Sequence, residues 1–313
     1  MSKWIAQAGV LTSWLPPRTF MYGPEGVGKT TWAAGAADAV FVGNEVGDAH
    51  LGMTRLPPVR TWSELVEQLR ELATEAHPWK VIVLDTVDSL HRLAERKVCA
   101  EAKVESIESV GGGYGRGPTA AAELWRNLLE GPLRAAFERG LHVVMLGHAK
   151  VATTKNPDGS DFDCHAPRVA DKVGGMIAGW CDVVLFAGME PRLSKVSAGM
   201  KAKVLGFERV IRTERTPQAM AKNRLSLPPK LGMEWSAFIR ALPKTAAEEV
   251  ARYRARLLEH IEAHVAEEER EARRAWVAGA SLAALRAALA KVEQAEAAAQ
   301  EAAEQEQAEG GGE

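Results

Sequence analysis

The sequence has few cysteines, few aromatic side chains and no long hydrophobic run. Its three cysteines, Cys99, Cys164 and Cys181, have neither the spacing of a disulfide framework nor that of a zinc site, which favours a reducing compartment. No apolar stretch approaches the length that spans a membrane, and residues 1–20 show no secretory signal. These absences argue against a disulfide-built domain and a membrane-spanning protein, and we expect a cytoplasmic one.

The net charge of −2 conceals an asymmetry along the chain. From Thr245 onward there are 8 Lys and Arg against 15 Asp and Glu, whereas residues 1–244 have 31 against 26. The body is therefore mildly basic and the tail acidic. A mildly basic body permits nucleic-acid binding without requiring it.

A phosphate-binding motif of the form G-x-x-x-x-G-K-[ST] is the most informative feature that is present. A short apolar run precedes it, and an alanine-rich, helix-forming segment at 31–40 follows it. Glycines let backbone N–H groups turn inward around phosphate oxygens. We predict that Lys29 reaches the β- and γ-phosphates of ATP and that the Thr30 hydroxyl binds Mg²⁺. The predicted ATP-binding residues are Gly23, Pro24, Glu25, Gly26, Val27, Gly28, Lys29, Thr30 and Thr31.

A second motif supplies a carboxylate for the same metal. The segment 79–86 is an apolar, β-branched run that ends in Asp85. Strands buried on both faces of a parallel sheet are continuously hydrophobic, and their carboxyl ends hold ligands. We therefore predict that Asp85 is the Walker B acid, which binds Mg²⁺ directly or through water.

Apolar segments alternate with helical ones along the rest of the chain, which predicts an α/β fold with a doubly wound, mostly parallel sheet. The last two strands are candidates for antiparallel addition at one edge, because their connection is short. The expected strands are 39–43, 81–85, 141–147, 182–188 and 204–213, and the expected helices include 62–77, 90–104 and 120–139.

Composition suggests four parts. Residues 18–243 form the expected ATPase core, and residues 244–292 carry helical apolar stripes. Residues 293–313 consist largely of Ala, Glu and Gln, and we expect them to be disordered. Residues 1–17 are a candidate for docking on a neighbouring subunit.

Four further residues are candidates for catalysis, each with a simpler structural alternative. Glu45 follows the second strand and is a candidate base for the attacking water, or else an exposed loop acid. His148 ends the strand 141–147 and is a candidate γ-phosphate sensor, or a structural histidine. Lys222 and Arg224 are candidates to neutralise charge on a neighbour's nucleotide, or belong to a basic turn.

Five motifs in this order resemble those of RecA-like P-loop ATPases, and among them the phage-encoded single-strand-annealing recombinases of the Sak type. The resemblance implies a DNA-stimulated ATPase that acts on single-stranded DNA as a ring or filament, uses ATP and Mg²⁺ in the host cytoplasm, and meets a single-strand-binding protein. The last motif also resembles one in RadA. The motifs are 23–30, Asn44-Glu45, Val83-Leu84-Asp85-Thr86, Gly147-His148-Ala149 and Ala221-Lys222-Asn223-Arg224.

The resemblance also implies that two loops, 106–118 and 150–172, face a DNA path. Cations that neutralise phosphates and aromatics that stack on bases suit sequence-tolerant binding of single strands. The alternative is that both loops are flexible linkers. The candidate DNA-binding residues are Tyr114, Arg116, Lys150, Lys155, Phe162, Arg168 and Lys172.

Other functions remain open at this stage. Within DNA metabolism the alternative is a helicase or loader ATPase related to RadA or DnaB. A small-molecule kinase would share the phosphate-binding loop but would place phosphate-clamping arginines in a lid, and no arginine-rich lid is evident. A nucleotide-gated binding module that hydrolyses ATP slowly is the third alternative.

Overall fold

The computed structural model describes residues 15–45, 51–154, 159–193, 204–243, 246–281 and 284–296. Two compact units result, one of residues 15–242 and one to which residues 1–14 and 243–313 belong. The candidate docking segment up to residue 14, Lys155 and the tail from residue 297 lie outside the described residues. None of the helices in the described ranges is long and apolar enough to cross a lipid bilayer.

The larger unit is built on one sheet with the order β10-β8-β7-β1-β5-β4-β2-β3. The strands from β7 to β3 run parallel. At one edge of the sheet, β8 pairs antiparallel with β7, and β10 pairs antiparallel with β8. The expected α/β fold with a mostly parallel sheet is therefore confirmed. The strands are β1 Thr19–Gly23, β2 Ala39–Val42, β3 Thr54–Arg55, β4 Val81–Asp85, β5 His142–Thr154, β6 Phe162–Pro167, β7 Val183–Leu193, β8 Val204–Arg212, β9 Lys222–Asn223 and β10 Lys230–Gly232.

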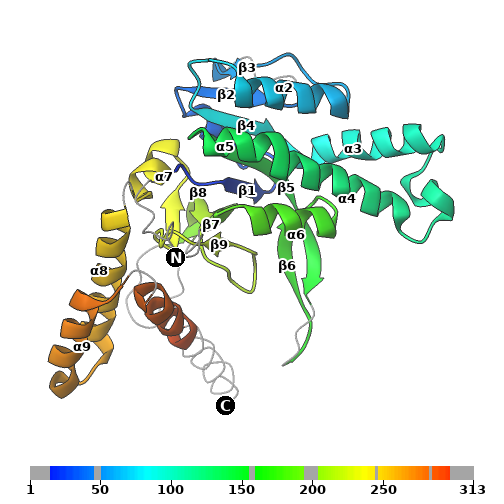
Figure 1. Cartoon of the computed structure of the whole chain (residues 1–313). Coiled ribbons are helices and arrows are strands. Elements are labelled where there is room, and N and C mark those ends of the chain that lie inside the picture. Colours follow the sequence, from blue (N-terminus) through cyan, green and yellow to red (C-terminus); the bar gives the residue numbers. More distant parts are fainter. Residues whose placement is uncertain are drawn as a thin grey trace, which may run out of the picture. The chain divides into compact units, whose positions relative to one another are not determined.

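Helices cover both faces of this sheet (Figure 1). One face packs against α2 Trp62–Thr74, α3 Val87–Ala102, α4 Arg116–Leu128, α5 Arg134–Glu138 and α6 Asp171–Trp180. The other face packs against α1 Lys29–Ala34 and α7 Trp235–Ala241, where Trp32 contacts Trp235 and Phe238. Because the central strands are apolar on both faces, neighbouring residues such as Phe20 and Met21 are both fully buried.

Several expected boundaries are wrong. The strand expected at 141–147 continues to Thr154 and pairs antiparallel with β6, so most of the expected loop 150–172 is a β-hairpin. Its residues are largely polar or solvent-facing, so a hydrophobic pattern did not mark it. The strand expected at 182–188 continues to Leu193 and pairs parallel with β1. Of the two strands expected to be antiparallel additions, 182–188 and 204–213, only the second, β8, is one.

Two more of the wrong boundaries concern helices. The expected helix 120–139 is interrupted by a π-helical turn, η4 Leu129–Leu133, because Gly131 and Pro132 break the regular backbone pattern. The helix after the phosphate-binding motif is also shorter than expected, since α1 ends at Ala34 and β2 begins at Ala39. The segment before α4 contains a short 3-10 turn, η3 Ile107–Gly112.

The second unit consists of helices in its described part. They are α8 Ala246–His264, α9 Glu267–Gly279 and a helical segment at 284–296. Their apolar stripes meet in a small core. That core contains Tyr253, Leu257, Ile261, Val277, Leu285 and Leu289.

Candidate nucleotide-binding site

The phosphate-binding loop begins where β1 ends, at the carboxyl edge of the parallel strands. Gly23 packs so closely on β7 that a Cβ atom there would lie 2.3 Å from the carbonyl oxygen of Ala187. Gly26 and Gly28 have φ angles of 71° and 100°, which glycine adopts most readily. The glycines of the motif therefore permit the close strand contact and the turns that carry the chain from β1 into α1.

Lys29 lies inside this loop and is only 6% exposed. Its Nζ donates hydrogen bonds to the carbonyl oxygens of Gly23, at 3.1 Å, and Pro24, at 2.9 Å. Burial lowers the pKa of Lys29, although the nearby carboxylates of Asp88, Asp85 and Glu45 oppose this effect. The ammonium group is thus held at the loop, where phosphate oxygens would be stronger partners than carbonyls.

Thr30 and Asp85 meet across the sheet edge. The Thr30 hydroxyl donates to Oδ2 of Asp85 at 3.2 Å, and Arg55 approaches the same oxygen at 3.5 Å. Asp85 is fully buried at the end of β4, beside β5. A hydroxyl and a carboxylate oxygen are ligands that suit Mg²⁺, so these two residues fit the expected metal.

Glu45 lies beside β4, the strand that ends at Asp85. β2 pairs in parallel with β4, so the segment after β2 reaches the same edge of the sheet as Asp85. The Thr86 hydroxyl donates a hydrogen bond of 2.9 Å to Oε1 of Glu45. The structure therefore brings the candidate base next to the candidate metal ligand, with one carboxylate oxygen held by Thr86.

His148 stands opposite Gly23 in the β1–β5 pairing. Its Nδ1 lies 2.8 Å from Oδ2 of Asp88, and its backbone N–H donates to Oδ1 of the same carboxylate at 3.0 Å. Arg168 donates to Asp88 at 3.3 Å and to Glu25 of the phosphate-binding loop at 2.8 Å. Glu25, Arg168, Asp88 and His148 thus form a continuous chain of polar contacts, which we call the relay.

The Asp88 carboxylate is ionised within this relay. Burial alone would raise its pKa, but its interactions with His148, together with the hydrogen bond from Arg168, outweigh burial and lower it. The pKa of Glu25 is also lowered, chiefly by its hydrogen bond from Arg168. Two carboxylates therefore share the Arg168 guanidinium, one of them on the phosphate-binding loop.

Lys222 and Arg224 do not join this site within one chain. β9 pairs with Val183 and Val184, which stand beside the first residues of β1, whereas the phosphate-binding loop follows the last residue of β1. Lys222 donates to the carbonyl oxygens of Ala178, Gly179 and Cys181, where α6 ends. Arg224 is 56% exposed and lies 3.8 Å from Asp182. Both residues thus lie toward the amino-terminal ends of the parallel strands, whereas the phosphate-binding loop lies at their carboxyl ends.

The candidate DNA-binding residues are spread over two regions. Tyr114 is 99% exposed beside Arg116, which donates to the carbonyl oxygen of Gly111. On the β5–β6 hairpin, Lys150 pairs with Asp171 at 2.7 Å and Phe162 is half-buried. Lys172 is exposed at the start of α6. Arg168 differs from the rest, because the relay connects it to the phosphate-binding loop.

Sequence reasoning missed three residues around the loop: Asp88, Arg55 and Arg209. Asp88 had a local signal, since it lies three residues after Asp85 in the first turn of α3. Arg55 and Arg209 had none, because they reach the loop from β3 and β8 through pairings between distant segments.

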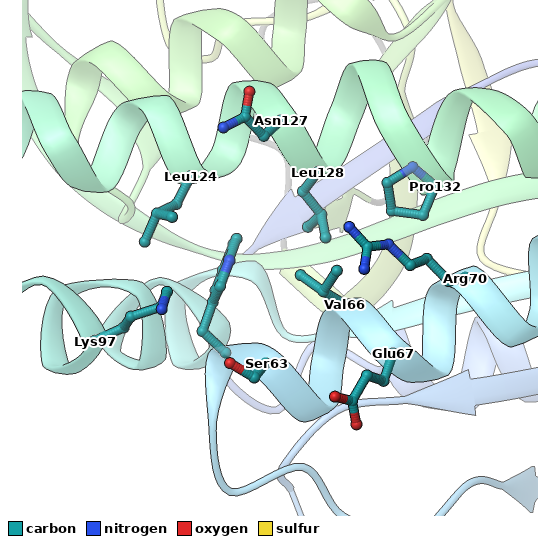
Figure 2. A pocket seen from close by; sticks show the side chains of 10 residues that line it. Ser63, Val66, Glu67, Arg70, Lys97, Leu124, Asn127, Leu128 and Pro132 are labelled. Atoms are coloured by element: carbon teal, nitrogen blue, oxygen red, sulfur yellow. The ribbon is translucent and has the colours of Figure 1, made fainter.

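A cavity of about 320 Å³ lies elsewhere, between α2, α3 and α4 (Figure 2). Trp62, Val66 and Arg70 line it from α2, and Leu124 lines it from α4. None of the residues that line it belongs to the motifs above. The candidate nucleotide site therefore rests on the converging motif residues and is separate from this cavity.

Comparison with known proteins gives matches of three kinds. A crystal structure of the RadB recombinase has a TM-score of 0.35 and 16% identity, with 65% of this chain and 83% of that chain covered. The SPbeta prophage-derived uncharacterized protein YorG of Bacillus subtilis (strain 168) is 23% identical over 133 residues, which is 41% of this chain. The matched region spans 40% of that relative. Residues 15–225, which include every motif described above, match the AAA domain family. The chain therefore belongs to the AAA domain family of P-loop nucleotide hydrolases.

Proposed function

We propose that this chain is an ATPase that acts on single-stranded DNA in recombination or annealing. The observation that carries the ATPase part is the convergence of Lys29, Thr30, Asp85 and Glu45 at one edge of the sheet. The DNA part draws on the mildly basic body and on the two exposed regions near Tyr114 and Lys150. The prophage origin of the curated relative supports a phage-encoded protein.

Each residue has a defined role in this proposal. Lys29 neutralises phosphate charge from inside the loop, and Thr30 and Asp85 would hold Mg²⁺. When bound, the metal ion stabilises the charge that develops on the phosphates. Glu45 orients a water molecule and accepts its proton, since its carboxylate lies beside Asp85 and is held by Thr86.

The relay gives the hairpin that carries Lys150 a physical connection to the phosphate-binding loop. Glu25 belongs to the phosphate-binding loop, whereas His148 belongs to β5, the strand that continues into the hairpin carrying Lys150. Arg168 follows β6 directly and bridges Glu25 and Asp88. A change of position at the loop would therefore reach both strands of the hairpin through hydrogen bonds.

The test is the steady-state ATPase rate of wild type and Lys29→Ala, with and without single-stranded DNA, at two salt concentrations. We expect stimulation by DNA that weakens with salt, because phosphate contacts release counterions, and no activity in the variant. An ATPase rate that does not respond to DNA contradicts the DNA part. Activity that requires a small phosphate acceptor would instead establish a kinase.

A further inference from the structure

Arg209 lies over the phosphate-binding loop, although no motif marks it. A Cβ atom added to Gly28 would lie 3.2 Å from Nη1 of Arg209. The arginine comes from β8, which pairs antiparallel with β7 beyond the end of β1. A long-range strand pairing thus places a guanidinium at the left-handed glycine that precedes Lys29.

Arg209 differs from the other cations around the loop. Arg168 pairs with Glu25 and Asp88, Arg55 approaches Asp85, and Lys29 donates to two carbonyl oxygens. In the described part of the chain, no carboxylate forms an ion pair with Arg209. Its side chain is exposed, so its charge is available to an anion on the loop.

The sheet order shows which part of a nucleotide Arg209 would meet. On one side of β1, the carboxyl ends of β5, β4 and β2 carry His148, Asp85 and Glu45. β7 and β8 lie on the other side. Since the metal ligand and the base belong near the γ-phosphate, Arg209 lies toward the α- and β-phosphates and the nucleoside.

Exposed apolar side chains, among them Met189 and Phe207, share the strand face of Arg209. Met189 stands directly opposite Arg209, and Phe207 is two residues away along β8, so strand alternation places all three on one face. Met189 is 56% exposed and Phe207 69%. We call these three residues the ribbon face.

The opposite face of the same ribbon has a different character. Glu190 and Glu208 stand opposite each other there, and Lys230 bridges them with ion pairs of 2.7 and 2.6 Å. That face is occupied by partners within the chain. The ribbon face instead offers an aromatic ring, a thioether and a cation.

We propose that the ribbon face forms the nucleoside side of the ATP site. Arg209 binds the α- and β-phosphates, and Phe207 and Met189 pack against the adenine base. The inference rests on the proposed ATPase function. An adenine nucleotide fits this arrangement because its anionic phosphates are joined to an apolar ring. The phosphates would meet the loop and Arg209, and the ring would meet Phe207.

Continuity with the phosphate-binding loop favours a nucleotide over a second copy of the chain. A nucleotide whose phosphates bind the loop carries its base toward one side of it, and Arg209 marks that side by its approach to Gly28.

The experiment compares Mg²⁺-ADP with Mg²⁺-pyrophosphate by titration calorimetry, since pyrophosphate has the two phosphates without the nucleoside. We expect Arg209→Ala to weaken both ligands about tenfold, the size of a lost charged hydrogen bond. We expect Phe207→Ala to weaken ADP about tenfold, the size of a lost base-stacking contact, and to leave pyrophosphate unchanged. We expect both variants to fold, because Arg209 and Phe207 are exposed, and circular dichroism would check this.

Matched controls are available on the same chain. Arg192→Ala removes a cation from the opposite face of the ribbon, and Val151→Ala removes an exposed apolar side chain from the hairpin. Both should bind ADP like wild type. Wild-type ADP affinity in Arg209→Ala and Phe207→Ala overturns the inference and leaves the ATPase intact, whereas a wild-type protein that binds no ADP overturns both.

Discussion

At the scale of single residues, buried ionisable groups determine what the site and the core require. Asp85 is fully buried and Lys29 nearly so, yet both are needed in charged form for the proposed chemistry. Burial lowers the pKa of Lys29, and the carboxylates around it counteract that effect. The site is therefore a set of charges that stabilise one another, and the removal of one changes the others.

Glu45 can be tested alone because its neighbour Thr86 holds it in place. Glu45→Gln keeps the hydrogen-bond acceptor but cannot accept a proton. We expect kcat to fall by about 10²-fold or more, with nucleotide affinity unchanged. Pre-steady-state hydrolysis and ADP titration measure the two quantities, and Glu67→Gln, an exposed change on α2, is the control. An unaffected rate would point to a slowly hydrolysing binding module.

His142 predicts a pH dependence of stability. It is buried beside Trp235 and Phe238, its ring nitrogen lies 3.0 Å from the Thr19 hydroxyl, and burial lowers its pKa from 6.5 to about 3. Between these values the unfolded chain binds a proton that the folded chain does not. Its contribution to stability is therefore complete above pH 6.5 and is lost as the pH falls toward 3.

The measurement is urea unfolding of wild type and His142→Gln at pH 7 and pH 5. Wild type should lose up to roughly 1 kcal/mol of unfolding free energy per pH unit more than the variant does. Asp88 contributes at lower pH, because its pKa is lowered from the usual range of a carboxyl group. Equal pH slopes for the two proteins would show that His142 is not the titrating group.

At the scale of elements, the relay connects structures that the sequence presents as separate motifs. The phosphate-binding loop, α3, β5 and the segment after β6 each contribute one side chain. Arg168 is the central member, because it bridges two carboxylates. Its role is coupling in this proposal, whereas the sequence predicted a direct DNA contact.

Arg168→Gln and Glu25→Gln distinguish these two roles. We expect each variant to lose most of the DNA stimulation of ATP hydrolysis while its affinity for single-stranded DNA is unchanged. The double variant should lose no more, because both changes break one contact. Fluorescence anisotropy measures DNA affinity and the ATPase assay measures stimulation. Weaker DNA binding by Arg168→Gln alone would establish the direct contact instead.

At the scale of the whole molecule, contiguous patterns were predictable and long-range pairings were not. The loop at Gly23–Thr30 and the strand that ends at Asp85 are marked by their own residues, and the alternation of apolar and helical segments predicted the parallel sheet. β6, β9 and β10 are short or polar, so no local pattern marks them, and they are recognised by their pairing with β5, β7 and β8. Arg209 likewise reaches Gly28 through the pairing of β8 with β7, which the residues around Arg209 do not indicate.

Arg224 bears on assembly, because it follows β9 near the amino-terminal end of β1 and the phosphate-binding loop follows the carboxyl end of β1. We propose that it acts on the nucleotide of a neighbouring copy. Arg224→Ala and Lys29→Ala should each be inactive alone, and their mixture should regain part of the ATPase activity. Arg224 is chosen over Lys222 because Lys222 binds the end of α6. A mixture that stays inactive, with both variants folded, argues against action between copies.

The three hydrogen bonds from Lys222 to the end of α6 have a thermodynamic consequence. α6 begins four residues after β6 ends, and its far end is fastened to the residue two positions before Arg224. The β5–β6 hairpin, α6 and the segment that carries Arg224 are thus connected in series. If Arg224 touches a neighbour's nucleotide, linkage requires reciprocity: a ligand on the hairpin that changes the neighbour's ATP affinity must have its own affinity changed by ATP by the same factor.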